Sequence, residues 1–150
     1  MKYILTTCAA VLLVAVSGFA VQEETQDAET AIKAACLDYI EGWFTGDAAR
    51  MERALSPELA KCMVNKMPNG REFLQRAPYI GMVEWTRMGV GKADPATQEI
   101  AVEILDIDGN IASAKITNKQ FIDLAHLGYI NGEWKIINVL WRPAQPKKQE

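Results

Sequence analysis

Apolar residues recur at helical spacing in the first third of the chain. Between residues 28 and 45, one face collects residues three or four positions apart: Ile32, Cys36, Tyr39, Ile40 and Trp43. This period predicts an amphipathic helix. Gly46 is placed to end that helix, and Asp47 is placed to cap a second helix over residues 48–55.

The pattern is less regular between residues 56 and 88. Ser56-Pro57 is typical of a helix start, with an N-cap residue followed by proline, and it predicts at least a helical turn through residue 60. Asn69-Gly70 predicts a turn. A third helix is expected over Tyr79–Met88, with these side chains facing mostly inward: Ile80, Val83, Trp85 and Met88.

The period changes from helical to alternating in the second half of the chain. Asp108-Gly109-Asn110 supplies the turn chemistry that separates two alternating segments. We expect strands over residues 98–107, 111–117, 121–130 and 133–142. Helices followed by such strands predict an α+β fold, in which the N-terminal helices pack on an antiparallel sheet.

The last two strands form the clearest hairpin and are joined by Asn131-Gly132. A two-residue loop of this kind sets the register of both strands. It places His126 opposite Ile137 and Asp123 opposite Leu140. His126 and Asp123 then point to opposite faces of the sheet, so they do not form a direct pair.

Both faces of this hairpin are mainly apolar. One is expected to carry Ile122, Leu124, His126, Gly128, Ile137, Val139 and Trp141. The other is expected to carry Phe121, Asp123, Ala125, Leu127, Tyr129, Trp134, Ile136, Asn138 and Leu140. An antiparallel sheet with one wet face alternates apolar with polar residues, so both faces need a cover. The helices supply one cover, and we expect a second copy of the chain to supply the other in a homodimer through the sheet.

The N-terminus has the organisation of a secretory signal peptide. Lys2 precedes an uncharged apolar stretch, and Gly18 and Ala20 place small residues at the positions that a cut after Ala20 requires. We therefore expect a signal peptide over residues 1–20, a flexible segment over 21–27, a single domain over 28–142 and a polar tail over 143–150. The alternative is an uncleaved membrane anchor. Cleavage predicts an exported protein, periplasmic or secreted, that has no membrane association.

Charge and cysteine content exclude several functions. Loss of Lys2 with the leader leaves 15 basic against 19 acidic residues, and an acidic chain without a basic cluster is a poor partner for nucleic acid. A single histidine and the absence of a Cys-x-x-Cys motif argue against a zinc site, so we expect no metal and no cofactor. Cys36 and Cys62 form either a disulfide or two separate thiols.

Three blocks of the sequence carry a family resemblance. DYIEGWFTGDAARMERALSPELAK at residues 38–61, EILDIDGNIASAKI at 103–116 and FIDLAHLGYINGEWKIINVLW at 121–141 resemble the "putative lumazine-binding" branch of the nuclear transport factor 2-like, or cystatin-like, superfamily. The resemblance covers residues 28–142. It implies a cone in which helices pack on a strongly curved antiparallel sheet, with a pocket between them. The superfamily includes isomerases, dehydratases and hydrolases as well as noncatalytic binders, so the fold does not select one function.

These observations favour an exported protein that binds a small apolar or aromatic molecule. Asp123 and Asn138 are expected to form a polar island on one face, and the resemblance implies that Tyr39, Trp43 and Trp141 line the cavity. One alternative is a cofactor-free isomerase, dehydratase or hydrolase, in which His126 or Asp123 moves a proton. His126 is otherwise a packed strand residue. A second alternative is a dimeric protein-interaction module.

Overall fold

The computed structural model describes residues 7–144, with side chains from residue 26 onward. The helices are α1 (Thr7–Thr45), α2 (Ala48–Ala54), α3 (Tyr79–Arg87) and the short 3-10 helix η1 (Pro95–Thr97). The strands are β1 (Leu55–Lys66), β2 (Glu72–Ala77), β3 (Ala101–Asp108), β4 (Ile111–Thr117), β5 (Phe121–Ile130) and β6 (Glu133–Pro143).

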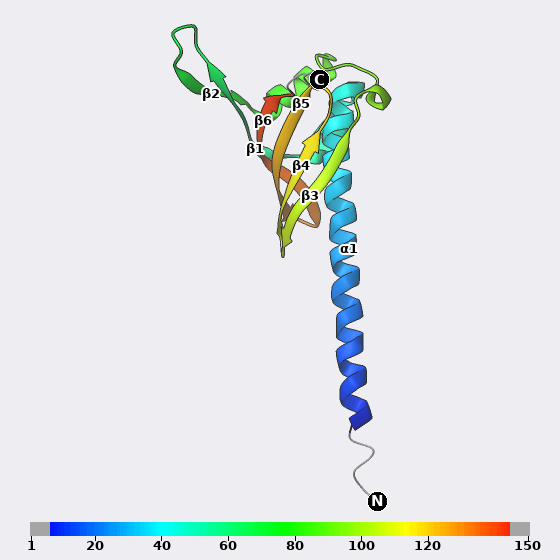
Figure 1. Cartoon of the computed structure of the whole chain (residues 1–150). Coiled ribbons are helices and arrows are strands. Elements are labelled where there is room, and N and C mark those ends of the chain that lie inside the picture. The colour runs from blue at the N-terminus through cyan, green and yellow to red at the C-terminus, as the bar shows by residue number, and fades with distance from the viewer. Residues whose placement is uncertain (1–6, 145–150) are drawn as a thin grey trace, which may run out of the picture. The chain divides into compact units, whose positions relative to one another are not determined.

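The six strands form one open sheet in the order β2-β1-β6-β5-β4-β3 (Figure 1). All neighbours are antiparallel except β1 and β6, which run parallel. A parallel pair needs a long crossover connection, and here the chain passes through β2, α3, η1, β3, β4 and β5 between β1 and β6. The predicted α+β class with helices on a sheet is therefore confirmed, and the sheet is mixed.

The chain comprises two units, Met1–Ala31 and Ile32–Glu150. In the first, the described backbone is helical from Thr7, and this helix includes residues 21–27, for which we expected a flexible segment. Residues 1–6 of the expected signal peptide and 145–150 of the expected tail lie outside the described residues. Within the described part of the chain, no helix has the length and apolar character needed to cross a membrane.

The second unit contains the sheet and the core. The C-terminal half of α1 buries four of the five residues that its spacing indicated, Ile32, Cys36, Tyr39 and Ile40, and also Phe44 one turn later. The fifth, Trp43, is half-buried. The Phe44 ring stacks on Phe121 of β5, with centroids 5.8 Å apart and planes within 4°. This part of α1 therefore covers the sheet face that holds Asp123, Ala125 and Leu127, which we call the inner face. The two expected end signals are also confirmed, since Gly46 has a φ of 77° and Asp47 caps α2.

The helical turn expected at Ser56-Pro57 is wrong, because these residues lie inside β1. The signal reflects a real local irregularity: Ser56 Oγ accepts a hydrogen bond from the Glu58 amide at 3.2 Å. The register of β1 against β6 shifts between Leu55 and Ala60. Proline has no N–H to donate and is tolerated in a strand at such a bulge. The partner strand β2 was not predicted at all.

The face expected for α3 is also wrong in part. Val83 is buried as predicted, whereas Ile80 and Met88 are more than half exposed and Trp85 is 38% exposed. Met82 and Thr86 are the other buried residues of α3. The helix is therefore rotated from the expected orientation, and this rotation brings Met82 towards the core.

A β-bulge changes the second half of the β5–β6 hairpin. Ile130 faces Glu133 as the loop predicts. Beyond the pair of Leu127 with Ile136 the register shifts, so that His126 faces Asn138 instead of Ile137, and Asp123 faces Trp141 instead of Leu140. One extra residue in a strand moves every later side chain to the opposite face. Asn138 and Leu140 therefore leave the inner face, and Val139 and Trp141 join it.

Candidate functional site

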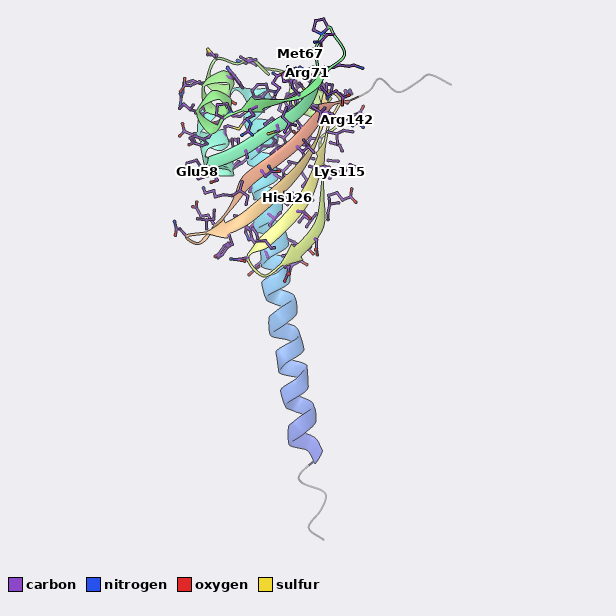
Figure 2. The ribbon with its side chains drawn as sticks, turned by 90° about the vertical axis from the view of Figure 1, so that its left-hand side faces the viewer. Glu58, Met67, Arg71, Lys115, His126 and Arg142 are labelled. Atoms are coloured by element: carbon purple, nitrogen blue, oxygen red, sulfur yellow. The ribbon has the colours of Figure 1, made fainter. Side chains whose placement is uncertain are left out.

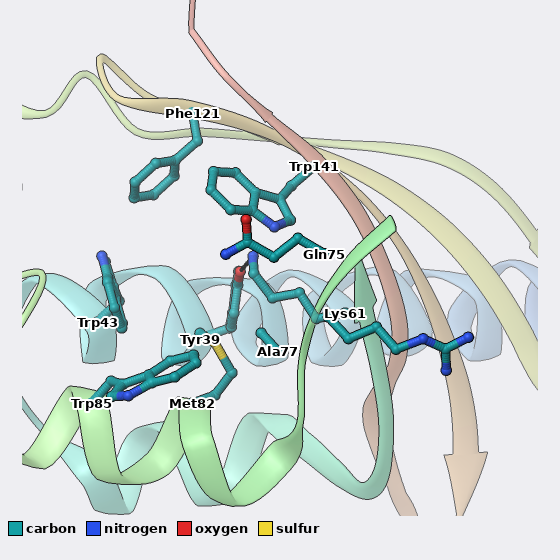
Figure 3. A pocket seen from close by; sticks show the side chains of 10 residues that line it. Tyr39, Trp43, Lys61, Gln75, Ala77, Met82, Trp85, Phe121 and Trp141 are labelled. Carbon is teal, nitrogen blue, oxygen red and sulfur yellow. Dashed lines mark hydrogen bonds between the residues drawn. The ribbon is translucent and has the colours of Figure 1, made fainter. Parts of the chain in front are cut away.

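A pocket of about 160 Å³ lies between α1, α3 and the inner face of the sheet (Figure 3). It is lined by Tyr39, Trp43, Lys61, Gln75, Arg76, Ala77, Met82, Trp85, Phe121 and Trp141. Five of these ten residues are aromatic. Gln75, Arg76 and Trp85 are exposed, so the pocket opens where α3 meets the end of β2, while the buried Tyr39 and Lys61 lie deep in it.

Three buried polar side chains meet at the deep end of the pocket. Lys61 Nζ donates to Asp123 Oδ1 at 2.9 Å and to the Tyr39 hydroxyl at 2.5 Å. The Tyr39 hydroxyl also lies 3.4 Å from the same carboxylate oxygen, to which it donates. Lys61 comes from β1, Asp123 from β5 and Tyr39 from α1, so two strands and a helix position this group, which we call the Lys-Asp-Tyr cluster.

Burial dominates the electrostatics of the cluster. Burial lowers the pKa of Lys61, and the opposing attraction of the Asp123 carboxylate does not fully cancel that effect. Burial first, and the Asp123 charge second, raise the pKa of Tyr39 well above its ordinary value. A low-dielectric environment disfavours the charged form of each group. Tyr39 therefore remains a proton donor, and Lys61 holds its proton less tightly than an exposed lysine.

The Asp123 carboxylate is only half satisfied. The side chain is fully buried, and Oδ2 has no hydrogen-bond partner among the described residues. Buried carboxylate oxygens without partners cost free energy. Asp123 does not itself line the pocket, since Lys61 and Tyr39 lie between its carboxylate and the pocket space.

Aromatic rings surround the ammonium group of Lys61. Its Nζ lies 4.9 Å from the ring centroid of Trp141 and 5.2 Å from that of Tyr39. The distance to Trp141 falls within the range of cation–π attraction, whereas Lys61 meets Tyr39 through the hydroxyl, which accepts from Nζ at 2.5 Å. Trp141 in turn meets Phe121 edge to face at 6.0 Å. Among the described residues that line the pocket, Lys61 is the one charged residue that is buried.

The position of Trp43 depends on the absence of a side chain at Gly91. A Cβ at residue 91 would lie 2.0 Å from Trp43 Nε1, closer than atoms can pack. The indole therefore lies directly against the backbone of the loop after α3. Its N–H has no acceptor among the residues that the structure describes. Gly91 thus fixes one wall of the pocket.

The structure brings together four of the six residues that the sequence indicated. Tyr39, Trp43 and Trp141 line the pocket, and Asp123 lies directly behind Lys61. The other two, Asn138 and His126, pair with each other on the opposite face of the sheet, which we call the outer face. Asn138 Nδ2 donates to the Ala60 carbonyl at 2.9 Å, which is a structural contact between β6 and β1.

His126 lies outside the pocket. It is exposed, and Figure 2 shows it on the sheet face away from α1, near Lys115 of β4. The packed role considered for this histidine is therefore wrong, and it has no contact with Asp123 because the two residues point to opposite faces. The polar island expected from Asp123 and Asn138 is wrong as well, because the bulge separates them.

Sequence reasoning missed Lys61, Trp85 and Gln75. Lys61 belongs to a stretch that was expected to begin as a helix, so its orientation in a strand was not considered. Read as a strand, the stretch alternates: Leu59 and Lys61 are buried, whereas Ala60 is exposed. The sequence signal that could have identified Lys61 is therefore a lysine at a position where the alternation expects a buried apolar residue.

Cys36 and Cys62 are free thiols. Cys36 is fully buried on α1, and Cys62 follows the inward-pointing Lys61 and so lies on the outer face of β1. The structure therefore favours separate thiols over a disulfide. Burial, and secondarily the Asp123 charge, raise the pKa of Cys36 to about 12.

Comparison with known proteins identifies a family. The family model described as "Putative lumazine-binding" matches residues 27–142. No curated protein matches the chain.

Solved structures share the fold at low sequence identity. An NTF2-like protein of unknown function from Shewanella baltica is 23% identical, with a TM-score of 0.64 over 80% of this chain and 96% of that one. A second such protein, from Silicibacter pomeroyi, is 17% identical, with a TM-score of 0.62 over 80% and 98% of the two chains. An NTF2-like protein with a cystatin-like fold from Novosphingobium aromaticivorans is 10% identical, with a TM-score of 0.61 over 88% and 92%. These likenesses concern the fold alone.

Proposed function

Because the chain belongs to the family described as "Putative lumazine-binding", we propose that it binds a small aromatic ring compound in the pocket between α1, α3 and the sheet. The family description names a ligand, and the pocket has the lining that a flat ring requires. Stacking and edge-to-face contacts with aromatic side chains favour planar ligands. The protein is a binder in this proposal, and the ring is oriented by polar atoms at its edge.

One observation carries the proposal: a buried lysine lies at the deep end of an aromatic pocket. The volume of about 160 Å³ is close to that of an apolar cavity that accepts benzene, so it has room for one substituted ring. Lys61 Nζ provides a donor for an oxygen or ring nitrogen of the ligand, and the Gln75 amide provides a second polar group near the rim. Pockets of this composition, apolar with few polar groups, are typical of small-molecule sites.

Fewer residues than expected are available for the alternative function, acid–base catalysis. His126 is exposed on the outer face, so chemistry in the pocket does not involve it. Asp123 reaches pocket space only through Lys61 and Tyr39. A catalytic version of this site therefore depends on the lysine and tyrosine, and His126 is not part of it.

Titration with benzyl alcohol tests binding directly. Trp43, Trp85 and Trp141 line the pocket, so we expect a saturable change in tryptophan fluorescence. Ala77→Phe places a ring inside the pocket and abolishes the change. Ala101→Phe is the matched control, since Ala101 is exposed on the edge strand β3. A fluorescence change that does not saturate with benzyl alcohol contradicts the proposal. The same fluorescence change in Ala77→Phe and Ala101→Phe contradicts it as well.

We also propose that the outer face of the sheet forms a homodimer. Leu140 of β6 has Leu124 of β5 and Cys62 of β1 as direct cross-strand neighbours, and both leucines are nearly half exposed. Val64 and Leu74 form a further exposed pair on β1 and β2. Contiguous apolar residues of this kind on a sheet face favour an interface, and a two-fold axis covers the same patch on both copies.

The mass in solution tests the dimer. Sedimentation velocity at micromolar concentration is expected to give the mass of two chains. The double variant Leu124→Glu/Leu140→Glu is expected to give the mass of one chain. Ile80→Glu is the control, because Ile80 is an exposed apolar residue on α3, away from the patch. A monomeric parent protein removes this part of the proposal.

Export is the third part of the proposal. It is supported by the apolar N-terminal stretch and the small residues that precede residue 21. The mature protein recovered from the exported fraction is expected to begin at Val21, as intact mass spectrometry measures. Ala20→Leu, with a large residue before the cut, is expected to block processing. A protein that retains residues 1–20 in that fraction contradicts cleavage.

A further inference from the structure

We propose that Lys61 is a covalent attachment site for carbonyl compounds, which it captures from the pocket as a Schiff base. This inference rests on the proposed function, because it names the ligand class of the same pocket: aromatic aldehydes and ketones. The inference goes beyond noncovalent binding, because it adds a reversible C=N bond between the ligand and the protein.

Lys61 differs from an exposed surface lysine in its burial and in its position in the pocket wall. Its side chain is 8% exposed, the residue lines the pocket, and Nζ lies between the Tyr39 hydroxyl and the Trp141 ring. A carbonyl ligand whose ring stacks in the pocket therefore presents its carbon to this amine. Burial also lowers the pKa of Lys61, which favours the free amine that acts as the nucleophile.

The two partners of Lys61 supply the proton transfers. Lys61 gives one proton to Asp123 Oδ1, 2.9 Å away, which removes both charges of the pair. The second carboxylate oxygen, Oδ2, has no hydrogen-bond partner among the described residues. The Tyr39 hydroxyl bonds to both groups, and Tyr39 also lines the pocket, so in this inference it relays protons between the pair and the ligand oxygen.

The reaction is a balanced condensation. The lone pair of the Lys61 amine forms a bond to the carbonyl carbon, and the C=O π bond breaks towards oxygen. Tyr39 donates its proton to that oxygen and takes one from the new ammonium, which gives a carbinolamine. The Tyr39 hydroxyl then relays the proton held by Asp123 to the carbinolamine oxygen, which leaves as water, and the nitrogen lone pair forms the C=N bond. The product is a cationic iminium beside an ionised Asp123, so the original charge pairing is restored.

Reductive trapping tests the inference in the mature protein. Benzaldehyde and sodium cyanoborohydride convert an imine into a stable benzyl amine, and peptide mapping locates it. We expect Lys61 to be labelled at least about tenfold faster than Lys66, an exposed lysine on the same strand, because the pocket holds the aldehyde beside the amine. Lys61→Arg keeps the charge and loses this label, whereas Lys66→Arg retains it.

Tyr39→Phe separates proton transfer from simple packing. Removal of the hydroxyl leaves the ring in the pocket wall and is expected to slow trapping at Lys61 by roughly 100-fold, the usual scale for a positioned acid. Affinity for benzyl alcohol, which has no electrophilic carbon, is measured in the same variant and is expected to fall by much less than the trapping rate, because the hydroxyl acts on the reacting atoms. Equal loss of both properties assigns Tyr39 a structural role and overturns its part in the mechanism.

The outcomes distinguish this inference from the proposed function. Saturable binding of benzyl alcohol together with labelling of Lys61 no faster than Lys66 overturns the covalent site and leaves the binding proposal intact. Absence of binding by both probes overturns the two together. Rapid labelling of Lys61 that excess benzyl alcohol suppresses supports both.

Discussion

The two faces of the β5–β6 hairpin differ in what their polar residues do. On the inner face, Asp123 is fully buried and bonded to Lys61, and Trp141 beside it closes the pocket. On the outer face, His126 is exposed, and Asn138 opposite it bonds to a backbone carbonyl of β1. The chain's only histidine, usually the first candidate for proton chemistry, is thus on the face without the pocket.

A single bulge produces this division. Without it, Asn138 would share a face with Asp123, and Trp141 would point away from the pocket. With it, Trp141 pairs with Asp123 and lies over the Lys61 ammonium. One extra residue in a strand therefore decides which side chains form the site, and residue type alone does not reveal it.

The largest expected effect on the inner face follows from Lys61→Met. The substitution leaves the Asp123 carboxylate buried without its cation, which typically costs about 3–5 kcal/mol of unfolding free energy. The double variant Lys61→Met/Asp123→Leu is expected to recover most of the loss, because no unpaired charge remains. Urea unfolding measures both. A loss in the single variant of under about 1 kcal/mol, comparable to an exposed change such as Lys66→Met, contradicts a buried pair.

Gly91→Ala is expected to disturb the pocket wall next most strongly. The added methyl group overlaps the Trp43 indole, and such overpacking typically costs about 1–3 kcal/mol. Affinity for benzyl alcohol falls as well, because Trp43 shifts. Gly128→Ala is the control, since a Cβ there meets only ordinary contacts at 3.7 Å or more. Equal stability and affinity in the two variants would show that Trp43 does not depend on Gly91.

The buried thiol of Cys36 is expected to make stability depend on pH above 9. Its pKa is raised from 9.0 to about 12 by burial and by Asp123, so the folded state keeps a proton that the unfolded chain loses. The resulting stability is fully present below pH 9 and is lost as the pH rises towards 12, by at most about 1.4 kcal/mol per pH unit.

Cys36→Ala is the variant that isolates this effect. It removes the titrating group, so the unfolding free energy falls less steeply between pH 9 and 12 than in the parent protein. Cys62→Ala, at the half-buried outer cysteine, is the comparison. Parallel slopes for Cys36→Ala and the parent contradict the assignment.

The smallest effects are expected on the outer face. Asn138→Ala removes the bond to Ala60 and costs about 1 kcal/mol. His126→Ala changes the unfolding free energy by no more than about 0.5 kcal/mol, the usual range for exposed sites, and leaves trapping at Lys61 unchanged. A loss of trapping in His126→Ala would place the histidine in the chemistry and break the division between the faces.

The fold was more predictable than the site. The apolar spacing of α1, the Asn131-Gly132 loop and the alternation of β4 and β5 each specify local structure directly, and the structure confirms them. β1 was not recognised, because Ser56-Pro57 is compatible with both a helix start and a strand bulge.

Tertiary contacts explain what the sequence did not reveal about the site. Lys61 joins the candidate site only because β1 lies beside β6, so that Asp123 and Tyr39 reach it. No local pattern encodes that pairing. Likewise, the loop Asn131-Gly132 sets the register at its own end of the hairpin, but the bulge beyond Leu127 resets it. Tyr39, Trp43 and Trp141 were nevertheless named from the family resemblance, which already includes the tertiary arrangement.

A backbone and methyl NMR titration with benzyl alcohol tests the central claim most directly, because it reports on both faces at once. The account predicts saturable chemical-shift changes at the inner face, with Tyr39, Lys61, Met82 and Trp141 affected and His126, Leu124 and Asn138 unchanged. Changes centred on His126 and its outer-face neighbours, with the Lys-Asp-Tyr cluster unaffected, would contradict it.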